Sequence, residues 1–199
     1  MLLLYAVAAG LVLGRVTGGH LDALATVRFR LWWLALGGLA FQLLLFAPPI
    51  ADRIGALGAP LYVASSALVF VAVLPNLREP GFALIAIGAA LNLMAIVANG
   101  GYMPSSPESW MRLNGEASVP ASGYTNSALI GDHTVLPFLG DIFVLPRPLP
   151  FANVFSIGDV LIGLGAIVFL VRTMHAGGLR VAPSVPGLRG HDLESASRR

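Results

Sequence analysis

Three aspartates in the C-terminal half of the sequence have surroundings suited to acid–base chemistry. Asp141 lies among apolar residues in the segment 138–143, Asp159 lies where the last apolar stretch begins, and Asp132 precedes both. Burial among apolar groups disfavours the charged form of a carboxyl group and would raise the pKa of Asp141. Two carboxyl groups that share one proton can activate a water molecule as acid and base. Asp141 and Asp159 are therefore the candidate catalytic pair, with Asp132 and its neighbour His133 as supporting candidates.

A structural explanation is open for each of these residues. Ser156 and Asp159 have the spacing of a capping box, in which two side chains bond backbone amides at the start of a helix. Asp141 also suits a turn, and Asp132 with His133 suits a hydrogen-bonded pair in a loop. The four titratable residues lack the ligand spacing typical of helix-borne metal sites, so we expect no metal and no cofactor.

Four further residues are candidates for binding. Asn99 and Gly100 follow an apolar stretch, where they would end a helix or form a turn around a substrate. Arg147 lies in the proline-rich segment 146–150, which we expect to be an extended lead-in to the last span. Its guanidinium group could meet a lipid phosphate or pair with an aspartate. Asn153, shortly after this segment, is the fourth candidate.

The elements that must position these residues are five apolar stretches. The chain has 199 residues, of which 56% are hydrophobic and 11% charged, whereas soluble domains carry about 25% charged residues. A membrane-spanning helix needs roughly 20 apolar residues. The expected spans are about 1–17, 31–50, 57–75, 81–99 and 152–171. The sequence therefore predicts an all-α membrane protein, with a bundle of about five transmembrane helices forming one domain over residues 1–175.

Two segments are expected outside the membrane. Residues 100–151 contain aromatic side chains, so we expect one long, structured extracytoplasmic loop. Residues 176–199 are rich in Gly, Pro, Ser and Arg, which predicts a disordered cytoplasmic tail.

Residues inside the spans predict how the helices meet. Small residues let helix backbones approach closely in lipid, and polar residues can hydrogen-bond between helices. The small residues are Gly37, Gly38, Gly88, Gly163 and Gly165, and the polar ones are Gln42, Ser65, Ser66 and Asn92. Pro48 and Pro49 should end the second span, and the tight turn 75–80 should join the third and fourth spans as an antiparallel hairpin.

The arginines predict the orientation. Nine of the twelve fall on one side and three (Arg53, Arg112 and Arg147) on the other if five spans are drawn. Cytoplasmic loops carry the excess of Arg, so the N-terminus should lie outside and the C-terminus in the cytoplasm. If the first stretch is instead a signal-peptide core, four spans remain and the N-terminus lies inside, with every other side unchanged. A composition rich in Ala, Gly, Leu and Pro and free of Lys is typical of GC-rich bacteria. We therefore expect the bacterial cytoplasmic (inner) membrane.

The C-terminal third resembles lipoprotein signal peptidase, also called signal peptidase II. The runs that carry the resemblance are 129–133, then 140–143 with Asp141 nine residues after Asp132, then 153–159 ending in Asp159. The resemblance implies a membrane-embedded aspartyl peptidase with Asp141 and Asp159 as the acid/base pair. The sequence departs from the family where His133 replaces its arginine.

Over its whole length the chain is more similar to an uncharacterised family of small bacterial multi-pass membrane proteins. The similar stretches are 99–104, 139–141 and 155–160. This resemblance implies a membrane location and no particular activity.

Two functions from different classes remain open. The first is a non-catalytic accessory or binding protein that uses its outer loop, and the alternative is the aspartyl peptidase. The expected partners are membrane lipid and either other membrane protein subunits or a lipid-anchored peptide substrate. The spans lack a central charge, which argues against an ion-coupled transporter. The absence of a basic stripe interleaved with aromatics argues against nucleic-acid binding.

Overall fold

The computed structural model describes residues 2–115 and 125–176, and these residues are mostly helical. The α-helices are α1 Leu2–Val16, α2 Trp32–Leu45, α3 Pro48–Ile54, α4 Gly58–Val73, α5 Phe82–Ala98, α6 Pro107–Asn114 and α7 Ile157–Ala176. The strands are β1 Met103–Ser105, β2 Ser127–Leu129, β3 Phe143–Leu145 and β4 Asn153–Phe155. Short 3-10 helices lie at Leu21–Thr26, Gly55–Leu57, Leu74–Asn76 and Pro137–Leu139.

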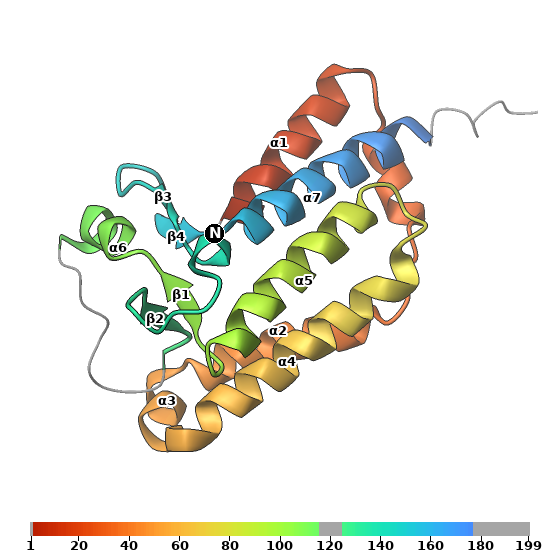
Figure 1. Ribbon diagram of the computed structural model, residues 1–199. Coiled ribbons are helices and arrows are strands. Elements are labelled where there is room, and N and C mark those ends of the chain that lie inside the picture. The colour runs from red at the N-terminus through yellow and green to blue at the C-terminus, as the bar shows by residue number, and fades with distance from the viewer. Residues whose placement is uncertain (1, 116–124, 177–199) are drawn as a thin grey trace, which may run out of the picture.

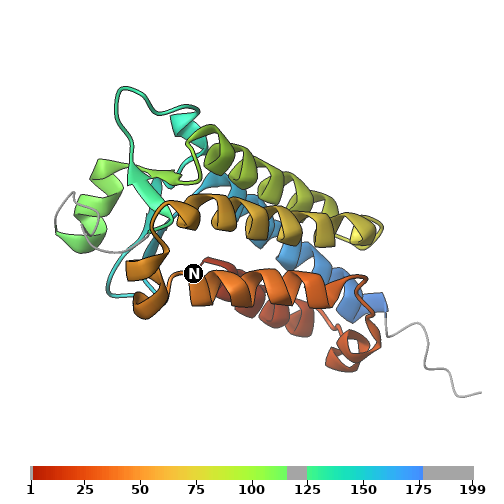
Figure 2. The ribbon, with the colours of Figure 1, turned by 90° about the horizontal axis from the view of Figure 1, so that it is seen from below.

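Five long helices lie side by side, and the strands and α6 form a cap at one end. Neighbouring helices pack in the order α1, α7, α5, α4, α2, so the first and last helices of the chain are adjacent (Figure 1). Figure 2, turned by 90°, shows α5, α4 and α2 in succession, with all three starting or ending at the cap. The hydroxyl group of Tyr5 donates to the carbonyl oxygen of Pro150 at 2.7 Å, which ties α1 to the cap.

The helices agree closely with the predicted apolar stretches. Helix α2 ends at Leu45, before the two prolines, and α3 begins at Pro48. Helices α4 and α5 pack against each other across the tight turn, so the predicted hairpin is confirmed. The last helix starts later than predicted, at Ile157, because β4 occupies the residues before it.

Glycines bring α7 very close to α5. A Cβ atom added at Gly88 would lie 2.4 Å from the carbonyl oxygen of Gly158, and one added at Gly165 would lie 2.6 Å from that of Gly81. Real Cβ atoms do not approach so closely, so these contacts require glycine. Gly37 instead faces open space, so its predicted packing within the bundle is wrong, and a face for a second copy of the chain stays a prediction for it.

Polar residues within the helices join neighbouring helices as predicted. The Gln42 amide of α2 donates to the hydroxyl groups of Ser65 and Ser66 on α4, each at 3.2 Å. Asn92 of α5 bonds Asp159 of α7. Each bond satisfies a polar group that would otherwise face apolar neighbours.

Many large apolar side chains lie on the outer surface of the helices, while small residues lie between them. Leu43, Val16 and Leu36 are 77%, 78% and 59% exposed, whereas Ala95 is fully buried. Among the described residues, two helical stretches are long and apolar enough to cross a membrane, Pro48–Asn76 and Ile157–Ala176, and three shorter helices are apolar. Length and composition therefore suggest membrane association, while the number of five spans stays a prediction.

The cap is built on short strands that the sequence analysis did not predict. β1 pairs with β2 in parallel, and β3 pairs with β4 in an antiparallel hairpin. The loop prediction of 100–151 is therefore right in being structured, but an all-α fold is wrong in this part. The residues 146–150 form the turn of the β3–β4 hairpin and not an extended lead-in. The predicted tail, from residue 177 on, lies outside the described residues.

Candidate functional site

Asp141 is held in place by its backbone. Its amide donates to the carbonyl oxygen of Pro104 at 2.7 Å, and its own carbonyl oxygen accepts from the amide of Ser106 at 3.0 Å. Asp141 thus pairs with Ser105 at the end of β1, on the side that β2 leaves free. Two backbone hydrogen bonds fix the position of a carboxyl group that would otherwise sit in a loop.

The β3–β4 hairpin brings Asp141 close to the start of α7. Phe143 lies opposite Phe155 in the antiparallel register, and their rings stack with centroids 5.4 Å apart. Continuing this register places Asp141 opposite the first residue of α7, two positions before Asp159. Aspartates that are 18 residues apart in the sequence are therefore brought to one end of the hairpin.

Asp159 closes the capping box that the sequence predicts. The Ser156 hydroxyl group accepts from the Asp159 amide at 3.0 Å, and the Asp159 carboxylate accepts from the Ser156 amide at 3.0 Å. The Asn92 side chain completes the cluster, since its amide group donates to the carboxylate at 2.9 Å and its oxygen accepts from the Ser156 hydroxyl group at 2.7 Å. One carboxylate oxygen of Asp159 is thus oriented by a donor from α5 and the other by the amide of Ser156, just before α7.

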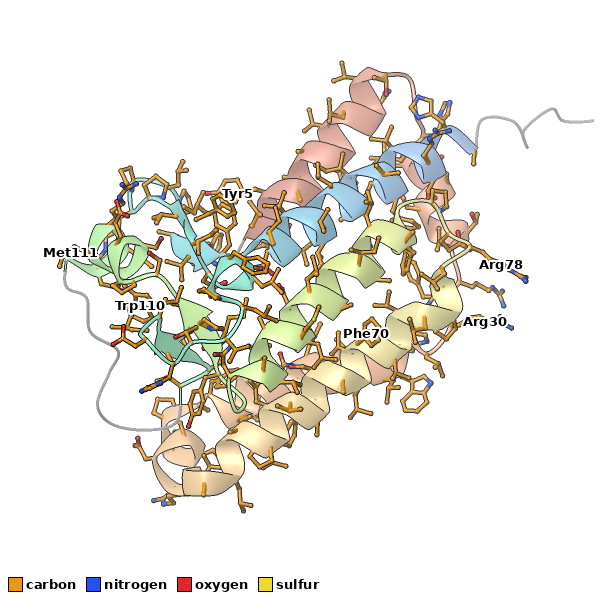
Figure 3. The ribbon with its side chains drawn as sticks, viewed as in Figure 1. Tyr5, Arg30, Phe70, Arg78, Trp110 and Met111 are labelled. Carbon is orange, nitrogen blue, oxygen red and sulfur yellow. The ribbon has the colours of Figure 1, made fainter. Side chains whose placement is uncertain are left out.

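The two carboxyl groups line one cavity of about 360 Å³. Its polar end is formed mainly by Asp141, Asp159, Asn92, Asn126 and Asn153, and residues of α2 and α4 add Gln42, Ser66 and Tyr62. The rest of the lining is apolar and comes mostly from α2, α4, α5 and α7, with Met103 of β1 and Val154 of β4. Phe70, which Figure 3 marks on α4, belongs to this apolar part. The cavity is therefore amphipathic, with its polar end beneath the cap.

The surroundings of Asp141 favour its neutral form. Burial raises its pKa from 3.8 to about 7, and the nearby Asp159 carboxylate adds to the rise. The fully buried Ser105 hydroxyl group lies beside the carboxyl group and offsets part of this rise, although the two do not meet in good hydrogen-bond geometry. Near neutral pH one carboxyl group of the pair can therefore hold a proton while donors orient the other.

The supporting candidates Asp132 and His133 lie apart from this pair. Both are exposed in the turn that starts at Gly131, where the Thr134 amide donates to the Gly131 carbonyl oxygen at 3.0 Å. Neither lines the cavity. The structure therefore brings together two of the three aspartates singled out in the sequence. Among the residues that the structure describes, no three His, Cys, Asp or Glu side chains lie close enough together to hold a metal ion.

Asn99 and Gly100 end a helix. The Asn99 side chain donates to the carbonyl oxygens of Ala95 and Val135, each at 2.8 Å, and accepts from the Val135 amide at 2.9 Å. Helix α5 stops at Ala98, and Gly100 follows with a φ of 66°. These residues fasten the cap to α5 and lie outside the cavity lining.

Arg147 forms its hydrogen bonds to another part of the cap, helix α6. Its guanidinium group donates to the carbonyl oxygen of Leu113 and, at 3.4 Å, to the side-chain oxygen of Asn114. Both acceptors lie at the C-terminal end of α6, where carbonyl groups lack helical partners. Arg147 therefore holds α6 against the β3–β4 hairpin, and its predicted pairing with an aspartate is wrong.

Five polar cavity residues were not assigned to the site from the sequence. Gln42, Ser66 and Asn92 were predicted only to bond between helices, and Tyr62 and Asn126 were not singled out. A polar residue inside an apolar stretch was the available signal for Asn92 and Ser66. Nothing local marks Asn126, because its place depends on the pairing of β1 with β2, where its carbonyl oxygen accepts from the Met103 amide at 2.6 Å. Asn153, a predicted binding residue, does line the cavity.

Comparison with known proteins places the chain in a family. Residues 26–171 match the family of unknown function DUF5317. An uncharacterized protein of Thermotoga maritima is 30% identical over 134 residues, which cover 65% of this chain and 73% of the relative. No solved structure matches the chain. The predicted likeness to an uncharacterised family is thus confirmed, while the likeness to signal peptidase II stays a prediction. The chain belongs to the DUF5317 family, whose function is unknown.

Proposed function

We propose that this protein is a multi-pass membrane protein that uses the Asp141–Asp159 pair to hydrolyse an amphiphilic substrate. The membrane part of the proposal is supported by the arrangement of side chains in the long helices. In water, exposed leucine and valine side chains across five helices would promote association. In lipid the same arrangement is favourable, because small residues allow close helix packing while large apolar ones face the acyl chains.

The proposed orientation puts the cap outside and the opposite end in the cytoplasm of a bacterial cell. Arg30 and Arg78 lie at one end of the bundle (Figure 3). Trp110 and Met111 lie in the cap, at the opposite end. Arg15, Arg28 and Arg172 are exposed like these two arginines and belong to the same predicted side. An excess of arginine on one side is typical of the cytoplasmic face.

The catalytic part of the proposal is carried by one observation: Asp141 and Asp159 line the same largely apolar cavity, and the charge of Asp159 adds to the raised pKa of Asp141. An aspartyl hydrolase needs one carboxyl group protonated and the other ionised at the working pH. Asp141, with a pKa of about 7, suits the acid. Asp159, oriented by the amide groups of Asn92 and Ser156, suits the base.

The proposed reaction needs only water and the two side chains. Asp159 accepts a proton from a water molecule, whose oxygen forms a bond to the carbonyl carbon of an amide or ester. Asp141 donates its proton to the carbonyl oxygen. The tetrahedral intermediate then collapses, and its carbon–nitrogen or carbon–oxygen bond breaks. The leaving group takes up the proton held by Asp159, and Asp141 regains a proton from a hydroxyl group of the intermediate, so the product is a carboxylic acid and the pair returns to its starting state.

The test is a cleavage assay with purified protein in detergent. The wild type, Asp141→Asn and Asp159→Asn are each offered a diacylglyceryl-modified prolipoprotein and simple long-chain amides and esters, with exposed Asp52→Asn as control. We expect cleavage of at least one substrate by the wild type and the control, and a loss of at least about 100-fold in both cavity variants. Equal rates in all four proteins, or no cleavage of any substrate, would overturn the catalytic proposal.

A second candidate function, an accessory or binding protein without catalysis, is favoured by a different observation. Both oxygens of Asp159 already accept hydrogen bonds inside the protein, so capping of α7 and closure of the cap explain this residue without a reaction. On this account the cap would bind its partners through exposed apolar residues such as Phe138 and Phe151, which are 63% and 61% exposed. Lower thermal stability of Asp159→Asn without any cleavage by the wild type would favour this function.

A further inference from the structure

The charges that line the cavity limit the polar groups it can accept. Asp141 and Asp159 are acidic, and none of the described residues that line the cavity is basic. Arg147, a cationic residue of the β3–β4 hairpin, turns to α6 instead. A negatively charged head group at this end would meet carboxyl groups in a poorly solvated site, where repulsion between like charges is strong.

One acceptor in the cavity lining, the side-chain oxygen of Asn153, has no hydrogen-bond partner among the described residues. The amide group of Asn153 donates to the carbonyl oxygen of Val154 at 2.8 Å, which fixes its orientation. Its oxygen is buried and has no partner among the described residues, and Asn153 lines the cavity. Buried acceptors are normally satisfied, so a bound molecule that offers a donor would complete this site.

The apolar part of the cavity suits a hydrocarbon chain. Leu39, Val69, Phe70, Leu93 and Ile162 line it from four different helices. Ligand sites of this kind bind mainly through apolar surface and use a few polar groups to fix orientation. Polar and apolar linings together therefore describe an amphiphile that enters with its polar group toward the cap.

We propose that the cavity selects amphiphiles whose polar group carries hydrogen-bond donors and no negative charge, such as amides, amines and alcohols, and that it rejects phosphates and carboxylates. This selectivity defines the substrate class of the proposed hydrolase site. The binding selectivity does not depend on hydrolysis, and only the reaction of a bound substrate rests on the proposed function. Asp159 and the Asn153 oxygen accept hydrogen bonds from the ligand. Neutral Asp141 donates to its carbonyl or hydroxyl oxygen.

The experiment measures binding of four probes that share a twelve-carbon chain. They are dodecylammonium, dodecylglycerol ether, N-dodecylacetamide and dodecyl phosphate, each added to the full-length protein in phosphatidylcholine nanodiscs. Binding to the folded state raises the midpoint of thermal unfolding. We expect the first three to raise it, and dodecyl phosphate to bind at least about tenfold more weakly, which corresponds to about 1.4 kcal/mol.

Single substitutions test whether the probes bind inside the cavity. Ala89→Phe on α5 fills the cavity that Ala89 lines and should abolish the shift. Ile87→Phe, on the same helix with a side chain 51% exposed, should retain it. Asn153→Leu, which removes the unsatisfied acceptor, should weaken the three donor probes and leave dodecyl phosphate unchanged. A shift with dodecyl phosphate as large as with the donor probes, or a shift that survives Ala89→Phe, would overturn the inference.

The binding result and the cleavage result can fail separately. Donor-selective binding without cleavage of any substrate would leave the inferred selectivity standing and refute the hydrolase. Cleavage that depends on Asp141 and Asp159 but prefers a phosphate-bearing substrate would refute the selectivity and leave the hydrolase standing.

Discussion

Asp141 combines a fixed backbone with a buried carboxyl group. Its backbone is fixed by strand pairing, and its carboxyl group is buried next to a second carboxylate. Asp159 is its counterpart, with both oxygens held by donors. At the scale of residues, the cavity thus holds one carboxyl group that favours its proton and one that is stabilised as an acceptor.

The first prediction concerns the pH dependence of stability. The pKa of Asp141 rises from 3.8 in the unfolded chain to about 7 in the folded protein, so the folded state binds more protons between these values. The contribution of Asp141 to stability is therefore greatest below about pH 4 and falls by up to about 1.4 kcal/mol per pH unit as the pH rises to about 7. Thermal unfolding in detergent from pH 5 to 9 measures this loss of stability. Asp141→Asn should flatten the decline below pH 7 and Asp52→Asn should not.

The second prediction concerns catalysis by the same group. If Asp141 is the acid, activity requires its protonated form and should fall as the pH rises through about 7. A cleavage profile that continues to rise above pH 8 would assign the acid to another group.

The third prediction concerns Asn92. Asn92→Leu removes a donor from Asp159 and an acceptor from Ser156, and it leaves both without that partner. We expect a loss of about 1–3 kcal/mol in the free energy of unfolding. Ser156→Ala loses one of the same bonds, so the double variant should lose less than the sum of the two single variants. Strict additivity would mean that the three side chains do not act as one network.

At the scale of elements, the helices could be predicted from the sequence and the cap could not. Apolar runs and flanking prolines define α1, α2, α4, α5 and α7, because these signals are local. The capping box at Ser156 could also be predicted, since its two side chains are three residues apart. The strands have only three residues each and depend on partners distant in the chain. The meeting of Asp141 with the start of α7 follows from the β3–β4 register, which no local pattern specifies.

The fourth prediction tests helix packing with a pair of glycines. Gly88→Ala would put a Cβ atom 2.4 Å from the Gly158 carbonyl oxygen, whereas Gly37→Ala meets open space. We expect the first substitution to lower the unfolding temperature markedly, because α5 and α7 must separate. The second should leave it unchanged or raise it, since alanine favours helix. Equal effects would mean that α5 and α7 do not pack through these glycines.

The whole molecule combines a helix bundle with apolar outer faces and a cap over one end of the cavity. The chain contains no cysteine, so single cysteines report topology without background. The fifth prediction is that Met111→Cys, in the cap, reacts with a membrane-impermeant maleimide on intact spheroplasts. Glu79→Cys, at the opposite end, should react only after permeabilisation. The reverse pattern would invert the proposed orientation, and equal labelling of both would contradict a membrane-spanning bundle.

An infrared titration of the carboxyl groups tests whether Asp141 and Asp159 form a pair in the cavity. We expect a protonated carboxyl band that titrates near pH 7, disappears in Asp141→Asn, and titrates at lower pH in Asp159→Asn because the neighbouring charge is removed. Asp52→Asn should leave the band unchanged. A carboxyl band that titrates only near pH 4 would contradict a pair of interacting carboxyl groups in the cavity. A band whose titration pH does not change in Asp159→Asn would contradict it as well.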